Sequence, residues 1–223
     1  MFRIKICGLT STDDALAAVN FGADAIGLNF YPKSARYIEP GKAKEITQAI
    51  SKTATPIGLF VNSTAEEIHK ICTQVGLQVV QIHGDEPPEF LSQIDNSLDV
   101  IRARRFSGDV LEKVAGDLRA CSDLAGTSPD AVLLDAESPG QYGGTGESLA
   151  WEKIADWPER LGGTPMILAG GLTPENVAEA IRTARPHGVD VASGVESSPG
   201  VKDLEKMRKF VKQAKAAFAE VNS

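Results

Sequence analysis

The chain has 223 residues, a formal net charge of −7 at pH 7 and a pI near 5.1. An acidic chain of ordinary composition disfavours nucleic acid and anionic membranes as partners, although a small and locally positive site can still bind an anion. No apolar stretch approaches the roughly 20 residues of a membrane-spanning helix, and no apolar signal core precedes the first predicted strand. The three cysteines lack CxxC spacing and histidine pairing, so we expect no zinc site and a reduced, cytoplasmic protein.

Eight short apolar runs recur along the chain and alternate with amphipathic stretches. They are nearly continuous in apolar residues, which is typical of parallel strands covered by helices. The expected strands are residues 3–7, 25–30, 56–61, 79–83, 100–103, 131–135, 165–169 and 189–192. About eight units without a reversal favour a closed α/β barrel of the (β/α)8 TIM type over an open doubly wound sheet. No linker divides the chain, so we expect one barrel domain over residues 1–223.

Signals for the start of a helix follow several of these strands. Ser11 precedes the first amphipathic stretch, and Thr64 precedes another that has two glutamates in its first turn. Thr173 and Pro174 predict the start of the helix after the seventh strand, because proline suits the first helical position. Residues 204–221 predict a long amphipathic helix that lies on the barrel wall and turns its basic face to solvent.

Two glycine-containing pairs follow the last two predicted strands. They are Gly170-Gly171 and Ser193-Gly194. Glycines there let backbone N–H groups approach a ligand, and the loops after strands seven and eight of such a barrel usually bind phosphate. We therefore predict a phosphorylated small molecule held by backbone amides; the alternative is that these glycines only make tight turns. Residues 136–147, rich in glycine and proline, predict a lid or binding loop, with a tolerated insertion as the alternative.

The carboxyl ends of the barrel strands are where catalytic side chains are expected. Cys7 ends the first strand and could act as a base or nucleophile once ionised. Asp135 ends the sixth, where burial would favour a proton-bearing carboxyl group suited to a general acid. Together they would form an acid/base pair for proton transfer. The alternatives are a buried small apolar residue at Cys7 and a loop cap at Asp135.

Several basic side chains are expected near the same end of the barrel. Arg36, in the loop after the second strand, could bind a carboxylate through two parallel hydrogen bonds, or lie exposed on the surface. His83 could contact a substrate or be a structural imidazole. Lys5 could orient or polarise Cys7, or pair with a carboxylate. The fifth strand carries three arginines, Arg102, Arg104 and Arg105.

Motifs spread over nearly the whole chain resemble the phosphoribosylanthranilate isomerase family of tryptophan biosynthesis. No single motif is decisive, but their order is highly specific. They are KICGLT at 5–10, SARYI at 34–38, QIHG at 81–84, LLD at 133–135, GGTG at 143–146, LAGGL at 168–172 and ASGVE at 192–196.

The resemblance implies an Amadori rearrangement with Cys7 as the general base and Asp135 as the general acid. The acid protonates the ribose ring oxygen as the ring opens to a Schiff base, and the base then removes the C2′ proton. Arg36 would hold the anthranilate carboxylate, and the glycine loops the phosphate. The expected substrate contacts are Arg36, His83, Gly144, Gly170, Gly171, Ser193 and Gly194. No metal or other cofactor is required, and we expect a monomer or a homodimer.

Two other interpretations remain open. Another phosphosugar barrel enzyme, of histidine or tryptophan biosynthesis, would be expected to use aspartates at strands one and five, or a lysine and glutamates at the mouth. Cys7 argues against both. A non-catalytic barrel that binds a phosphate ligand would not need Cys7 and Asp135 to face one cavity.

Overall fold

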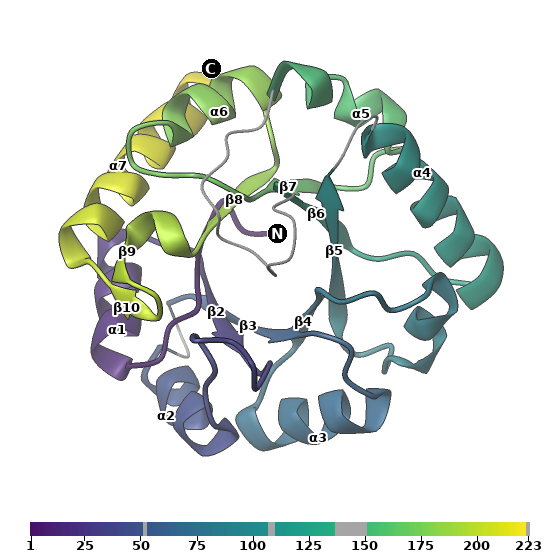
Figure 1. Cartoon of the computed structure of the whole chain (residues 1–223), viewed down its shortest axis with the longest axis horizontal. Helices are drawn as coiled ribbons and strands as arrows, with labels where there is room; N and C mark the ends of the chain where they lie inside the picture. Colours follow the sequence, from purple (N-terminus) through teal and green to yellow (C-terminus); the bar gives the residue numbers. More distant parts are fainter. Residues whose placement is uncertain (51–52, 107–109, 137–150, 222–223) are drawn as a thin grey trace.

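The computed structural model describes residues 1–50, 53–106, 110–136 and 151–221. Eight parallel strands follow one another around a closed barrel, because β1 pairs with both β2 and β8. Figure 1 shows the helices as a ring outside these strands. The strands are β1 (Ile4–Cys7), β2 (Ala25–Asn29), β3 (Thr55–Phe60), β4 (Val79–Ile82), β5 (Asp99–Phe106), β6 (Ala131–Ala136), β7 (Met166–Leu168) and β8 (Gly188–Val191). The predicted (β/α)8 barrel is confirmed, with each predicted strand at its expected place.

The outer ring is less regular than the strands. Its α-helices are α1 (Thr12–Phe21), α2 (Pro40–Ile50), α3 (Ala65–Val75), α4 (Val110–Ala120), α5 (Trp157–Arg160), α6 (Val177–Ala184) and α7 (Leu204–Val221). Short 3₁₀ segments are η1 (Pro88–Gln93), η3 (Trp151–Ile154) and η4 (Ser193–Val195), and a π-helical turn, η2 (Cys121–Ala125), extends α4. After β8 the chain also forms a small hairpin, β9 (Glu196–Ser198) and β10 (Val201–Lys202), which the sequence did not predict.

Local capping explains where the helices begin. The Ser11 side chain accepts a hydrogen bond from the Asp14 N–H, and Thr64 forms a capping box with Glu67, as the sequence indicated. The start predicted at Thr173 is wrong, because α6 begins only at Val177. The Asn176 side chain accepts from the Thr173 N–H at 2.7 Å and donates to the Gly171 carbonyl at 2.9 Å, which holds the intervening residues as a turn.

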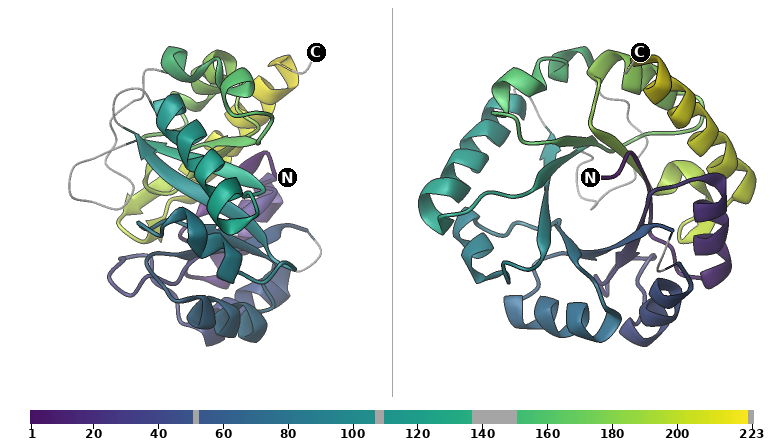
Figure 2. Two further views of the ribbon diagram at one scale, coloured as in Figure 1. Left: turned by 90° about the vertical axis from the view of Figure 1, so that its right-hand side faces the viewer. Right: turned by 180° about the vertical axis from the view of Figure 1, so that it is seen from behind.

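The apolar core has two main parts, besides a small cluster of Cys7, Leu59 and Val61. One lies inside the barrel and is made of Phe2, Ala25, Ile57, Ile101, Ala103, Ala131, Leu133, Ile167 and Ala169. The larger part lies between the strands and the outer helices. Seen from behind, the amino terminus lies at the centre of the ring (Figure 2), and Phe2 belongs to the part inside the barrel. In the described part of the chain, every helix is too short or too polar to cross a membrane.

Two of the three arginines of β5, Arg102 and Arg104, are turned away from the barrel mouth, contrary to the expectation. Successive strand residues point to opposite faces, and Ile101 and Ala103 point inward. Arg102 and Arg104 therefore point outward, and both bind the Asp117 carboxylate of α4 at 2.8–3.2 Å. Arg102 is completely buried there. These two arginines tie a strand to its covering helix and do not face the cavity at the carboxyl ends of the strands.

Candidate functional site

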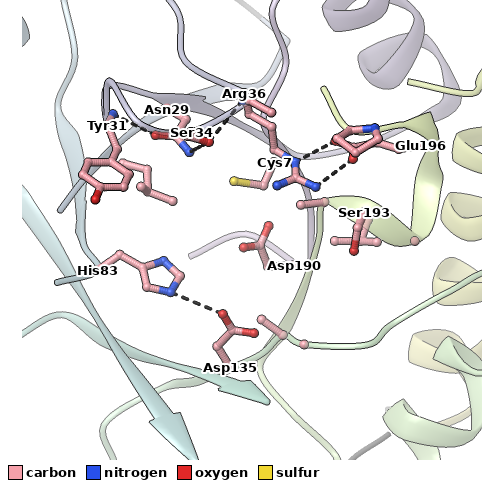
Figure 3. A pocket seen from close by; sticks show the side chains of 18 of the residues that line it. Cys7, Asn29, Tyr31, Ser34, Arg36, His83, Asp135, Asp190, Ser193 and Glu196 are labelled. Carbon is pink, nitrogen blue, oxygen red and sulfur yellow. Dashed lines mark hydrogen bonds and ion pairs between the residues drawn. The ribbon is translucent and has the colours of Figure 1, made fainter. Parts of the chain in front are cut away.

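A cavity of about 730 Å³ opens at the carboxyl ends of the strands. Its walls include the two residues that were predicted as acid and base, Cys7 and Asp135. They come from β1 and β6, which lie three places apart around the ring, and Figure 3 shows both side chains directed at the same space. The catalytic interpretation requires this arrangement, whereas a simple phosphate binder does not.

Cys7 lies above a buried ion pair. Lys5 is two residues earlier on β1, so it shares the inward face with Cys7. Its ammonium group donates to Asp190 Oδ2 on β8 at 3.0 Å and to Gln81 Oε1 on β4 at 2.9 Å. The strand register places Lys5 directly beside Asp190, so barrel closure itself brings these charges together. The second alternative given for Lys5, that it pairs with a carboxylate, is confirmed.

The protonation of Cys7 reflects its burial as well as its neighbours. Burial raises the pKa of the Cys7 thiol above its usual value, and the Asp190 carboxylate adds to the rise. The Lys5 ammonium lowers the pKa of Cys7, as expected, but only reduces this rise. For Lys5 itself, burial lowers the pKa, but Asp190 and Cys7 together outweigh burial and the pKa ends above its usual value, so Lys5 keeps its charge. A substrate group or a closing loop that brings positive charge to Cys7 would favour the thiolate.

Asp135 and the imidazole of His83 face each other, and both line the cavity. The Oδ2 atom of Asp135 lies 3.3 Å from His83 Nε2 (Figure 3). This distance is long for a hydrogen bond, and Nε2 has no better-aligned partner among the described residues. The other ring nitrogen, Nδ1, lies 2.8 Å from Gln81 Nε2. Gln81 therefore contacts both Lys5 and His83 from beneath the cavity floor.

Arg36 is held by a carboxylate of its own protein. Its Nε and Nη2 atoms donate to the two Glu196 oxygens at 2.8 and 2.7 Å (Figure 3). Lys202 donates to the same oxygen, Glu196 Oε1, at 2.9 Å. Burial raises the pKa of Glu196, but Arg36 and Lys202 outweigh it and hold the pKa below its usual value. The guanidinium group still has its Nη1/Nη2 edge, which can bind a second carboxylate in parallel.

The two glycine loops meet at one side of the same cavity. Gly170, Gly171, Ser193 and Gly194 all line it. Gly171 has a φ of +64°, in the left-handed region that favours glycine, and a Cβ atom at Gly194 would overlap the Leu172 carbonyl oxygen. The hydrogen bonds among the described residues use neither the Gly171 nor the Gly194 N–H. The loops thus approach each other closely and keep amide donors for a ligand.

The remaining findings concern predicted residues outside the described ranges, site residues that were not predicted, and metal binding. Gly144 and most of the predicted lid, 136–147, lie outside the described residues. Four polar residues of the site were not predicted, namely Gln81, Asp190, Glu196 and Lys202. A signal existed for the first two, because each is an isolated polar residue in an otherwise apolar strand. No cluster of three metal-binding side chains occurs within the described ranges.

Comparison with known proteins gives a consistent family. Residues 4–213 match the family model described as N-(5′-phosphoribosyl)anthranilate (PRA) isomerase. The chain is 44% identical over 218 residues to the isomerase of that name from Trichlorobacter lovleyi, covering 98% of this chain and 100% of the relative. The corresponding protein of Myxococcus xanthus is 45% identical over 214 residues, covering 96% of each chain.

Solved structures agree with this result. The phosphoribosyl anthranilate isomerase of Thermotoga maritima superimposes with a TM-score of 0.85 at 39% identity, covering 97% of this chain and 100% of that one. An isomerase in complex with reduced 1-(O-carboxyphenylamino)-1-deoxyribulose 5-phosphate gives a TM-score of 0.82 at 37% identity, with the same coverage. The chain therefore belongs to the N-(5′-phosphoribosyl)anthranilate isomerase family and is an enzyme, an isomerase of tryptophan biosynthesis.

Proposed function

We propose that this chain converts N-(5′-phosphoribosyl)anthranilate to 1-(2-carboxyphenylamino)-1-deoxyribulose 5-phosphate, with Cys7 as the general base and Asp135 as the general acid. One observation carries the assignment of roles. A thiol, a carboxyl group and two amide-bearing glycine loops line a single cavity of about 730 Å³. That cavity has the size of a small-molecule site and combines an anion-binding end with an acid/base pair.

The proposed chemistry is two proton transfers without a cofactor. Asp135 donates its proton to the ribose ring oxygen while the anthranilate nitrogen pushes the ring open to a Schiff base. Cys7, as thiolate, removes the proton from C2′ and gives an enolamine, which tautomerises to the ketone. Each transfer needs its group within hydrogen-bond reach of the reacting atom, and positions on β1 and β6 support approach from two sides of one sugar.

Substrate binding would use the two ends of the cavity. Gly170, Gly171, Ser193 and Gly194 would bind the phosphate through backbone amides, and Arg36 the anthranilate carboxylate through its remaining guanidinium edge. Both nitrogens of His83 are directed at protein groups, so it would meet the substrate with its ring face. Gly144 remains a predicted contact from the sequence.

The direct test is conversion of N-(5′-phosphoribosyl)anthranilate by the purified protein, followed through the loss of substrate fluorescence. We expect turnover that is abolished by Cys7→Ala with Asp135→Ala and unaffected by metal chelators. A folded wild-type protein that binds the substrate and leaves it unchanged would favour the non-catalytic alternative. Conversion of only the histidine-pathway substrate would favour the other phosphosugar barrel enzymes.

Assembly, domain number and location follow less directly. We propose one domain over residues 1–223, because the barrel closes only when β1 from one end of the chain pairs with β8 from the other. One cooperative unfolding transition would support this. We also propose a cytoplasmic monomer or homodimer that binds neither nucleic acid nor membrane. The three cysteines are free, which fits a reducing compartment, and sedimentation would measure the oligomeric state.

A further inference from the structure

Gln81 has an orientation that its neighbours determine. It is completely buried, and its Oε1 atom lies 2.9 Å from the Lys5 ammonium. An ammonium group can only donate hydrogen bonds, so the Gln81 oxygen must face Lys5. The amide N–H group of Gln81 then faces His83, and the distance from Gln81 Nε2 to His83 Nδ1 is 2.8 Å. A flipped amide would place two donors against each other at Lys5.

The fixed amide determines where His83 carries its hydrogen. Because Gln81 donates to Nδ1, that nitrogen must accept, and it carries no hydrogen. A neutral imidazole then has its hydrogen on Nε2. Nε2 is buried and is directed at Asp135 Oδ2, 3.3 Å away. An imidazole that carried hydrogen on Nδ1 would place it against the Gln81 amide.

We propose that Gln81 is a positioning residue of the reaction: it holds His83 as the neutral Nε2–H tautomer, so that the proton Asp135 transfers is carried on Oδ1. Oδ2 is then the oxygen that faces the N–H group, so it is the one that accepts when Nε2 and Asp135 come into hydrogen-bond contact. The acid proton is then left on the oxygen that does not face His83. The role in turnover rests on the proposed function of Asp135 as the acid, whereas the tautomer itself does not.

Gln81 also joins the two catalytic groups through one buried chain of contacts. Lys5 lowers the pKa of Cys7 on one side and holds the Gln81 oxygen on the other. His83 continues the chain to Asp135. The charged lysine thus favours the thiolate at the base and, through a neutral amide, fixes the hydrogen that faces the acid. A carboxylate in place of Gln81 would keep the first contact and reverse the second.

The first experiment is ¹⁵N NMR of the histidine ring nitrogens in the wild-type protein. The chain has three histidines, and the His83 signals are the ones that disappear in His83→Gln. We expect Nδ1 of His83 to give the shift of an unprotonated nitrogen and Nε2 that of a protonated one at neutral pH. A hydrogen on Nδ1 in the wild type overturns the proposal, whatever the enzyme's activity.

The second experiment compares Gln81→Glu with Gln74→Glu, which adds the same charge at an exposed position of α3. The new carboxylate at position 81 still accepts from Lys5, but it now accepts from His83 as well, so Nδ1 gains a hydrogen. Either Nε2 becomes an acceptor and draws the acid proton to Oδ2, or the imidazolium ion holds Asp135 ionised. Both outcomes remove the proton from Oδ1. We expect kcat to fall about tenfold or more with KM nearly unchanged, and no change in Gln74→Glu.

The outcomes separate this proposal from the proposed function. If Gln81→Glu switches the ring tautomer and turns over like the wild type, the positioning role is wrong. If the wild type shows no isomerase turnover, the proposed function fails, and the ring spectrum still decides the tautomer. Should Gln81→Glu fail to fold, Gln81→Met removes the amide donor without adding charge. We then expect His83 to show both tautomers and kcat to fall, and an unchanged spectrum would contradict the proposal.

Discussion

Arg36 binds Glu196 through two parallel hydrogen bonds, from Nε at 2.8 Å and from Nη2 at 2.7 Å. The two residues are 160 positions apart, and Glu196 is itself held by Lys202. The pair therefore fixes the plane of the guanidinium group before any ligand arrives. A donor held in advance loses less conformational entropy when it binds a carboxylate.

We expect Arg36→Met to raise KM for the anthranilate substrate by about 10- to 100-fold while kcat changes little, because a charge-assisted hydrogen bond contributes about 1.5–3 kcal/mol. Glu196→Gln should raise KM less, since Arg36 remains but is no longer held on both atoms. Steady-state kinetics of the two variants measure this order. Arg182→Met is the control, because Arg182 lies exposed on the outer helix α6. Unaltered kinetics in Arg36→Met would show that the ion pair is only structural.

Cys7→Ser and Asp135→Asn should each reduce kcat by roughly 10²–10⁴-fold, the usual contribution of a positioned acid or base. Both substitutions preserve side-chain size, and neither group supplies much ground-state binding, so KM should change little. Substrate affinity measured under single-turnover conditions separates binding from chemistry. A variant that turns over within a few-fold of the wild type would remove that residue from the mechanism.

The buried Lys5–Asp190 pair predicts opposite shifts in the reactivity of Cys7. Burial raises the pKa of Cys7, the Lys5 ammonium lowers it, and the Asp190 carboxylate raises it. Lys5→Met should therefore move thiolate formation to higher pH, and Asp190→Asn to lower pH. The rate of Cys7 alkylation by iodoacetamide against pH, read from peptide masses, measures both shifts. Burial raises the pKa of Cys72 to about 12, so it serves as an unreactive internal reference. Shifts of the same sign in both variants would contradict this prediction.

Much of the barrel was predictable because its strands are buried on both faces. Each leaves a continuous apolar run, and the rule that function lies at the carboxyl ends then places Cys7 and Asp135 among the candidates at the mouth. Their definite roles as base and acid came from the family resemblance. The start of α6 was predicted wrongly at Thr173, because a side-chain contact from Asn176 stabilises a turn there. Such a contact competes with the helix, and proline position alone does not reveal it.

The partners of the charged residues could not be predicted from local patterns. A lone aspartate in the eighth strand indicates a buried polar contact, but its partner Lys5 is 185 residues away and meets it only on barrel closure. Glu196 ends the ASGVE motif, but no local pattern indicated its contact with Arg36, since it begins an unpredicted hairpin. Arg102 and Arg104 of β5 were placed at the mouth because strand direction was considered without side-chain parity. Parity turns Arg102 and Arg104 toward α4.

Asp117 should be a major contributor to stability. Burial would raise the pKa of Asp117, but hydrogen bonds from Arg102 and Arg104 outweigh it and lower the pKa. The stabilisation that the Asp117 carboxylate gives to the fold is therefore complete above its unfolded-state pKa of about 4. It is lost as pH falls through the lower folded-state pKa. Asp117→Asn should reduce the free energy of unfolding at pH 7 by about 3 kcal/mol, because it leaves the fully buried Arg102 with the Glu86 carbonyl but without a carboxylate.

Urea unfolding of Asp117→Asn at several pH values between neutral and acid tests this prediction. The loss of stability on acidification should be smaller in the variant than in the wild type. Glu205→Gln breaks an exposed pair with Arg208 on α7 and should leave the unfolding midpoint unchanged. Equal midpoints for Asp117→Asn and the wild type at pH 7 would show that the arginines are satisfied in another way.

Gly194→Ala should weaken the binding of inorganic phosphate and of substrate together. The added methyl group overlaps the Leu172 carbonyl oxygen, so the two glycine loops must separate and their amide donors no longer converge. Losing one or two charge-assisted hydrogen bonds corresponds to roughly a tenfold or greater rise in both the phosphate inhibition constant and KM.

Gly41→Ala is the matched control, because Gly41 lies exposed in the first turn of α2 with nothing within 4 Å of the added carbon. Circular dichroism confirms folding of both variants. If folded Gly194→Ala and Gly171→Ala both bind phosphate as tightly as the wild type, the anion binds elsewhere in the cavity. Arg102 and Arg104 would not be the replacement site, since Asp117 already holds them.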